Sequence, residues 1–350
     1  MNIVSVNASH RYDVIIGNDL LSDLGKYAAK IRPNCTVVII SDTNVWPLYG
    51  NCAVSSISSA GLAQIHFVIP AGENSKNAKT YLEIVNFLAE NKITRSDLII
   101  ALGGGVVGDI TGFAAATYLR GLSYLQVPTT LLAMVDSSVG GKTAIDLPAG
   151  KNLLGAFKQP SLVLCDISTL STLPESVFID GCAEVIKYGM LYDAELVQYL
   201  MTAGLNFDRE LVITKCVTYK RDVVQEDEFD IGARQKLNFG HTIGHAIESM
   251  SNFRITHGMA VAAGMSIVTK AAFNKKLCSE ATYQTLIKLL ERFNLPVETY
   301  YSAHELYTSA LSDKKRSGGS VNLIIPRTIG DCDILSLPVI ELTSFIEAGL

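Results

Sequence analysis

Four short apolar runs, each ending at a glycine, a proline or a polar pair, dominate the first half of the chain. They are Thr36–Ile40, Gln64–Ile69, Asp97–Leu102 and Tyr124–Val127, and helical stretches such as Asn77–Glu90 lie between them. Runs that are apolar at successive positions are typical of parallel strands, which helices cover on both faces. The pattern therefore predicts an α/β, Rossmann-like fold for this half.

The pattern changes near residue 174. Apolar residues recur every three or four positions in Leu211–Val223 and Tyr283–Leu290, and only Val321–Ile325 resembles a strand. This spacing is typical of amphipathic helices. We therefore expect two domains, an α/β domain over residues 1–173 and a largely α-helical domain over residues 174–350.

Composition excludes several classes of protein. Hydrophobic residues make up 48% of the chain and charged residues 18%, against a usual charged fraction of about 25%, so a disordered chain is excluded. The net charge of -5 leaves no general basic surface for nucleic acid. The N-terminus lacks a signal-peptide pattern, and the longest apolar runs are too short to cross a membrane. Seven scattered cysteines indicate reduced thiols, so we expect a cytoplasmic protein.

A glycine-rich turn follows the third apolar run. Gly103, Gly105 and Gly108 match the spacing G-x-G-x-x-G, which lets backbone N–H groups and a helix N-terminus approach a pyrophosphate. Such glycines can also serve tight packing alone. Asp42 ends the first run, where it is a candidate either to accept the ribose hydroxyls of NAD or to cap the next helix.

A metal site is indicated in the second half, where three of the six histidines lie close together in sequence. His241 and His245 are one helical turn apart, and His257 follows after a short connection. Glu184 is a charge within an apolar helical stretch. Imidazoles and a carboxylate are typical of an open catalytic zinc site, although a histidine pair can also be an ordinary helix face. The spacing leaves open which histidines bind metal and which move protons.

Cationic residues near glycines or in apolar surroundings indicate an anionic substrate. Lys142 and Lys151 each follow a glycine, and Lys187 lies near Glu184 on one helix face. Single lysines are usually solvated surface charges, which is the alternative for each of them.

In these motifs the chain resembles the 3-dehydroquinate synthase family, within the sugar-phosphate cyclases. The resembling segments are Gly103–Asp109, Pro128–Ala133, Gly140–Lys142, Gly150–Asn152, Ala183–Gly189 and Leu237–Glu248, in order between about residues 40 and 320. The resemblance implies a carbon–oxygen lyase that converts 3-deoxy-D-arabino-heptulosonate 7-phosphate to 3-dehydroquinate and phosphate, in the shikimate pathway of aromatic amino-acid biosynthesis. It implies transient oxidation by NAD, phosphate elimination, re-reduction, ring opening and an internal aldol addition.

The resemblance also implies roles for individual residues. A Zn²⁺ or Co²⁺ ion would be held by Glu184, His241 and His257, and catalysis would use His245, Lys187, Asn238 and Lys142. NAD would contact Asp42, Asn44, Glu73, Lys76, Gly103, Gly104, Gly105, Asp109, Thr129, Thr130, Lys142 and Lys151. Substrate would contact Asp136, Lys142, Asn152, Lys187, Lys220, Arg234, Asn238, His245 and one of Lys314 and Lys315, of which we prefer Lys314. Arg120 would reach the site of a second subunit in a homodimer.

Three alternatives stay open. Another sugar-phosphate cyclase would act on a substrate without a carboxylate. A metal-dependent alcohol or glycerol dehydrogenase would have a similar glycine turn and helical half but would need fewer cations. A non-catalytic NAD-binding regulator would have no use for an open metal site.

Overall fold

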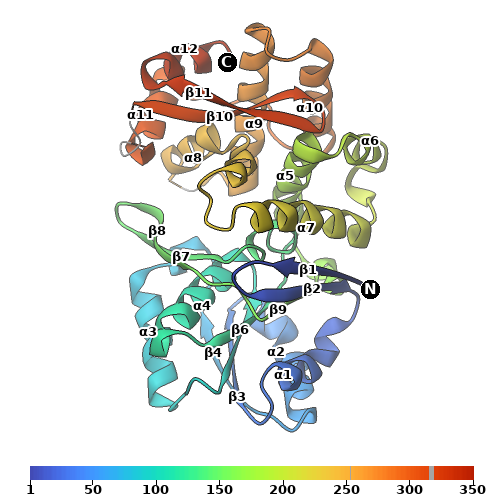
Figure 1. Cartoon of the computed structure of the whole chain (residues 1–350), viewed down its shortest axis with the longest axis vertical. Helices are drawn as coiled ribbons and strands as arrows, with labels where there is room; N and C mark the ends of the chain where they lie inside the picture. Colours follow the sequence, from blue (N-terminus) through green and yellow to red (C-terminus); the bar gives the residue numbers. More distant parts are fainter. Residues whose placement is uncertain (253, 315–318) are drawn as a thin grey trace. The chain divides into compact units, whose positions relative to one another are not determined.

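The structure is a computed structural model that describes residues 1–252, 254–314 and 319–350, with the side chains of residues 312–314 left out of the description. Its contacts divide the chain into two units (Figure 1). Unit 1 contains Met1–Pro174 and Arg209–Phe229, and unit 2 contains Glu175–Asp208 and Asp230–Leu350. This division differs from the predicted one in Arg209–Phe229, which the contacts assign to unit 1.

Unit 1 is built on a seven-stranded sheet in the order β1-β2-β9-β6-β5-β3-β4. The bounds are β1 Asn2–Asn7, β2 Arg11–Gly17, β3 Thr36–Asp42, β4 Ala63–Ile69, β5 Leu98–Gly103, β6 Ser123–Pro128 and β9 Leu162–Asp166. All four predicted strands are confirmed, as β3 to β6, and they run parallel. β1, β2 and β9 were not predicted from the sequence.

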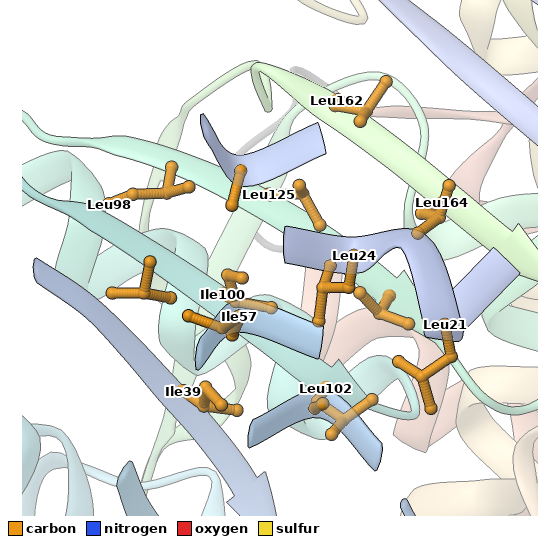
Figure 2. Close-up of a cluster of buried hydrophobic side chains, with 14 of the residues drawn as sticks. Leu21, Leu24, Ile39, Ile57, Leu98, Ile100, Leu102, Leu125, Leu162 and Leu164 are labelled. Carbon is orange, nitrogen blue, oxygen red and sulfur yellow. The ribbon is translucent and has the colours of Figure 1, made fainter. Parts of the chain in front are cut away.

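Helices cover both faces of this sheet, as continuously apolar strands require. They are α1 Leu24–Ile31, α2 Trp46–Ser59, α3 Ala78–Glu90 and α4 Gly105–Thr117. Alternate residues of β3 pack in two separate cores. Val37 and Ile39 pack with Leu24 and Ile57, as Figure 2 shows for part of this cluster. Val38 and Ile40 instead pack in the core that α3 and α4 cover.

The order of the strands creates a switch point. The chain passes from β3 outward to β4, and then returns to place β5 on the other side of β3. In open α/β sheets a ligand crevice forms beyond the carboxyl ends of the strands where the order reverses. Asp42 at the end of β3 and Gly103 at the end of β5 therefore lie at the expected position for a ligand site.

The segment Arg209–Phe229 contains helix α7, Arg209–Glu226, which packs beside β1. Glu210 accepts a hydrogen bond from Asn2 Nδ2 at 2.9 Å, and Gln225 accepts one from the backbone of Asn7 at 2.8 Å. These contacts explain why the segment belongs to unit 1. Helical periodicity predicts the helix but does not specify the core against which it packs.

Unit 1 also contains a hairpin of β7, Lys142–Leu147, and β8, Gly150–Phe157. Lys151 and Asn152 follow its turn at the start of β8, and Asn152 has a positive φ of 55°. The Asp146 carboxylate accepts the backbone N–H of Asn152 at 2.8 Å. Asp146 N–H donates to the Lys76 carbonyl at 2.7 Å, which ties the hairpin to the segment after β4.

Unit 2 is largely helical, as predicted. Its helices are α5 Glu175–Tyr192, α6 Ala194–Ala203, α8 His241–Met250, α9 His257–Asn274, α10 Glu280–Arg292, α11 Ala303–Lys314 and α12 Leu342–Glu347. The strand-like run at Val321–Ile325 lies in β10, Ser320–Thr328, which pairs with β11, Asp331–Pro338. Among the described residues, no helix combines the length and apolar character that a membrane span needs.

Candidate functional site

Three side chains from three helices of unit 2 converge on one point. Glu184 on α5 is fully buried, and its Oε1 lies 3.4 Å from Nε2 of His241 on α8 and 3.4 Å from Nε2 of His257 on α9. The three groups each offer one ligand atom within 4.8 Å of the others. The structure thus brings together the three residues that the resemblance assigned to the metal.

The separations fit a metal better than direct hydrogen bonds. A charge-assisted N–H···O contact is about 2.7–2.9 Å long. Two ligands about 2.05 Å from a tetrahedral zinc ion are instead about 3.3–3.4 Å apart. The donor set, one carboxylate and two imidazoles, is also one that binds zinc and leaves a position open.

The two histidines differ in their electrostatics. Burial lowers the pKa of His241 to about 3, although Glu184 opposes this effect. Burial would also lower the pKa of His257, but Glu184 and Glu248 together raise it to about 10. A neutral ring such as His241 is the form that ligates a metal.

Glycines set the close approach of α8 and α9. A Cβ on Gly264 would lie 2.1 Å from the carbonyl oxygen of Gly240, and one on Gly244 would lie 3.0 Å from that of Ala260. Gly240 precedes α8 with a φ of 77°, a backbone conformation that residues with a side chain rarely adopt. The backbone contacts therefore fix the spacing between the helix that carries His241 and the helix that carries His257.

Polar groups outside this set orient the two imidazoles. Nδ1 of His241 lies 3.0 Å from the carbonyl oxygen of Phe239, and Nδ1 of His257 lies 3.5 Å from Glu248 Oε2. In each ring the Nε2 atom faces Glu184 instead. No role was predicted for Glu248, whose signal in the sequence is an acidic residue on the buried face of a short helix.

Asp180 is the second residue without a predicted role. It lies on α5, four positions before Glu184, and its Oδ1 accepts the backbone N–H of Met259 at 3.0 Å and the hydroxyl of Thr256. Burial raises the pKa of this carboxyl, while those hydrogen bonds oppose the shift. Its signal in the sequence is a second acid at helical spacing from Glu184.

The remaining predicted residues of unit 2 have varied surroundings. Lys187 is buried and forms an ion pair with Glu184 Oε2. The His245 ring is exposed, 5.3 Å from the His241 ring and 5.9 Å from the His257 ring between centroids. In the 3-10 helix Ala233–Asn238, Arg234 is buried and Asn238 is exposed. Lys315 falls outside the described residues, as does the side chain of Lys314.

In unit 1, the predicted NAD residues form two groups, the first at the switch point. Asp42 Oδ1 accepts the backbone N–H groups of Asn44 and Val45 at 2.8 and 3.0 Å, so the helix-capping alternative is part of its role. No described residue donates to its Oδ2.

Gly105 begins α4, whose N-cap residue, Gly104, provides no side-chain cap. The Thr129 N–H donates to the Gly103 carbonyl at 3.0 Å, and a Cβ on Gly104 would lie 3.0 Å from Thr130 Cγ2.

The second group surrounds the buried Lys76. Its Nζ lies 2.6 Å from Asp109 Oδ2, 2.6 Å from Asn152 Oδ1 and 3.8 Å from Glu73 Oε1. Lys151 Nζ lies 3.2 Å from the same oxygen of Glu73. Burial would lower the pKa of Lys76, but Asp109 and Glu73 raise it above its ordinary value. The resemblance assigned four of these residues to NAD and Asn152 to the substrate.

Other predicted residues of unit 1 lie outside these two groups. Lys220 on α7 is buried, and its Nζ donates to the carbonyl and the carboxylate of Asp136 at 2.6 and 2.9 Å. Lys142 is exposed at the start of β7. Arg120 is exposed on the short 3-10 helix Tyr118–Arg120, with a positive φ of 68°.

Solved structures share this fold. A 2-epi-5-epi-valiolone synthase from Streptomyces hygroscopicus, with NAD⁺ and Zn²⁺ bound, matches with a TM-score of 0.89 and 27% identity over 98% of each chain. A 2-deoxy-scyllo-inosose synthase complexed with carbaglucose-6-phosphate, NAD⁺ and Co²⁺ matches with a TM-score of 0.89 and 24% identity over both whole chains. The chain thus has the fold of the sugar-phosphate cyclases.

Sequence comparison narrows the class further. Residues 66–180 match the family described as 3-dehydroquinate synthase N-terminal, and residues 181–316 match the one described as 3-dehydroquinate synthase C-terminal. A 3-dehydroquinate synthase of Enterococcus faecalis is 43% identical over the full length of both chains. The chain belongs to the 3-dehydroquinate synthase family.

Proposed function

We propose that the chain converts 3-deoxy-D-arabino-heptulosonate 7-phosphate to 3-dehydroquinate and phosphate, as an NAD- and metal-dependent carbon–oxygen lyase. The observation that carries the proposal is the position of Glu184 Oε1, 3.4 Å from Nε2 of both His241 and His257, in a chain of this family. The overall reaction breaks one C–O bond to phosphate and forms one C–C bond. NAD would be recovered unchanged after each cycle, so none would be consumed.

Glu184, His241 and His257 would hold Zn²⁺ or Co²⁺. Such an ion supplies Lewis-acid stabilisation for a hydroxyl undergoing oxidation. Lys187, ion-paired with Glu184, adds positive charge beside the same carboxylate. His245, exposed and close to both ligand histidines, would move a proton at a ring nitrogen to or from substrate.

The proposed role of Glu248 gives a testable result. Replacing Glu248 with leucine, which keeps the bulk but removes the acceptor for His257 Nδ1, is expected to lower Zn²⁺ affinity about 10–100-fold, the usual effect of losing such a partner. Competition with a chromophoric chelator measures the affinity. Glu291→Leu on α10 is the control, because Glu291 lies on an exposed face. An unchanged affinity in Glu248→Leu would contradict this role.

NAD would bind along the carboxyl ends of β3, β5 and β6. The first turn of α4 begins without a side-chain cap, so its backbone N–H groups suit a pyrophosphate. Lys76 and Lys151 provide cations near this end of the sheet, and Asp109 and Glu73 orient them. NAD, when bound, accepts and returns a hydride.

Asp42 allows the cofactor role to be separated from helix capping. Asp42→Asn keeps an oxygen for the N–H groups of Asn44 and Val45 but removes the charge. We expect it to retain stability and to weaken NAD binding about 10-fold or more, because hydrogen bonds to a charged group contribute about 1.5–3 kcal/mol. Asp42→Ala should lose both the stability that the helix cap provides and the affinity for NAD. Calorimetric titration with NAD and thermal unfolding measure the two effects, and undiminished NAD affinity in Asp42→Asn would leave Asp42 as a cap only.

The proposed substrate contacts carry the charges that a carboxylate and a phosphate require. In unit 1 these are Lys142, Lys220 with its partner Asp136, and Asn152. In unit 2 they are Lys187, Arg234, Asn238, His245 and Lys314. Buried Lys187, Lys220 and Arg234 are the most preorganised of the cations, since burial limits the conformations of their side chains.

We also propose a homodimer in which Arg120 acts on the site of the partner subunit. Its side chain is exposed, and the backbone turns sharply through Leu119, Arg120 and Gly121, all with positive φ. Mixing Arg120→Ala with His245→Ala chains and allowing subunit exchange is expected to restore about a quarter of wild-type activity, since half of the dimers are mixed and each has one intact site. If Arg120 acts within its own subunit, the mixture will stay inactive.

The reaction itself is tested by incubating the protein with NAD, Zn²⁺ and the heptulosonate phosphate. We expect phosphate release without accumulation at the NADH absorbance band. Stoichiometric NADH would instead indicate a dehydrogenase, and no turnover at all would favour a binding protein. Phosphate release from a sugar phosphate without a carboxylate, at an equal rate, would favour another cyclase activity.

A further inference from the structure

One face of α5 carries three charged residues in a row. Asp180, Glu184 and Lys187 are separated by four and three positions, which places them on one helical stripe. All three side chains are buried, and Asp180 is 9% exposed. Glu184 belongs to the proposed metal site and Lys187 pairs with it, so Asp180 is the member of the stripe without an assigned purpose.

Asp180 caps the helix that begins with His257. Thr256 occupies the N-cap position of α9, but its side chain makes no cap hydrogen bond to that helix. The hydroxyl of Thr256 donates to Asp180 Oδ1 instead, and the backbone N–H of Met259 donates to the same oxygen at 3.0 Å. The carboxylate on α5 therefore replaces the missing cap, and its negative charge suits a helix N-terminus.

Gly258 brings the two helices into backbone contact. A Cβ at this position would lie 1.9 Å from the carbonyl oxygen of Asp180, so no other residue fits without movement of α5 or α9. The backbone contact at Gly258 and the capping hydrogen bond at Met259 involve the two residues that follow His257. Together they fix the start of α9 one helical turn along α5 from Glu184.

We propose that Asp180 is a positioning residue for the metal site, which holds His257 at ligand distance from Glu184. The inference rests on the proposed metal-binding function of Glu184, His241 and His257. Asp180 acts through the backbone of α9 and is not itself a ligand, because neither group of potential metal ligands among the described residues includes it. Its loss should allow the first turn of α9 to move and should weaken metal binding.

Another capping aspartate of unit 2 provides a matched control. Asp193 is the N-cap of α6 and accepts the N–H of Leu196 at 2.9 Å. Asp193→Ala removes an ordinary cap from a helix that carries none of the three ligands. If Asp180 were only a cap, the two alanine variants would affect stability similarly and leave metal affinity alone.

The experiment measures Zn²⁺ affinity by chelator competition, and ligand geometry from the visible spectrum of the Co²⁺-loaded protein. Asp180→Ala is expected to bind Zn²⁺ about 10–100-fold more weakly, with an altered Co²⁺ spectrum. Asp180→Asn, which keeps Oδ1 as an acceptor, should recover most of the affinity. Asp193→Ala should match wild type in both measurements.

The outcomes separate this inference from the proposed function. Wild-type protein that binds no metal would overturn the proposed metal site itself. Wild-type binding with unchanged affinity and spectrum in Asp180→Ala would overturn only the role of Asp180. If Asp180→Ala fails to fold, Thr256→Val decides: it removes one donor to Asp180 at an exposed residue, and an affinity equal to that of wild type would overturn the inference.

Discussion

Replacing His257 with alanine is expected to remove bound metal, whereas replacing His245 leaves the metal in place and slows turnover. His257 Nε2 faces Glu184 at 3.4 Å, but the exposed ring of His245 lies outside the three-residue cluster around Glu184. Loss of a direct ligand should lower the Zn²⁺ affinity more than about 100-fold, which is the largest usual effect of losing a residue that only hydrogen-bonds to a ligand. Loss of a proton-transfer group should lower kcat about 100- to 10,000-fold.

Metal content after dialysis and single-turnover kinetics distinguish the two variants. The competing arrangement is the second group of His245, Glu248 and His257, whose ligand atoms also lie within 4.8 Å of one another. Metal lost from His245→Ala but retained in Glu184→Gln would favour that group. Full retention in His257→Ala would reject the assignment of His257 as a ligand in either group.

The second large effect concerns a glycine that touches no ligand. Gly264→Ala is expected to destabilise the folded protein by about 3 kcal/mol, at the upper end for overpacking, and to abolish metal binding. The added Cβ would lie 2.1 Å from the Gly240 carbonyl oxygen and 2.9 Å from the Gly244 nitrogen, both of which are backbone atoms. Relief of that clash separates α8 from α9, and therefore His241 from His257.

Gly189→Ala is the matched control for this prediction. It also adds a methyl group within a helix of unit 2, but the nearest atom is Val197 Cγ2, at 2.8 Å, a side-chain methyl that can shift. Both variants gain about 1 kcal/mol of helix propensity. Denaturant unfolding and zinc affinity measure both effects; equal behaviour of the two variants would show that the α8–α9 backbone contact does not set the site.

The elements that could be predicted were those whose burial pattern is local. β3 and β5 are apolar at nearly every position because helices cover both faces, and this appears directly in the sequence. β1 and β11 are partly exposed, so their alternating patterns are weaker, but β9 is buried at every position and was not predicted either. The helix α7 was predictable as a helix, but its partner β1 lies about 200 residues away in sequence and left no local signal.

The same distinction applies to the candidate site. His241, His245 and His257 are close in sequence and histidine is rare in this chain, so their grouping was visible. Which ring faces Glu184 depends on the helix approach that Gly264 and Gly258 permit, and that cannot be derived from spacing. Asp180 and Glu248 escaped notice because one buried carboxylate has no signature until its partner on another helix is known.

The course of the chain through the two units also constrains how the protein can be made in pieces. Unit 1 lacks α7 until residue 226 has been synthesised, since residues 175–208 of unit 2 intervene. A recombinant fragment ending at Pro174 would leave β1 without Glu210 and Gln225, and Asp136 without Lys220. During synthesis, unit 1 therefore stays incomplete while about fifty further residues are added to the chain. A laboratory fragment needs α7 supplied through a new linker or as a separate peptide.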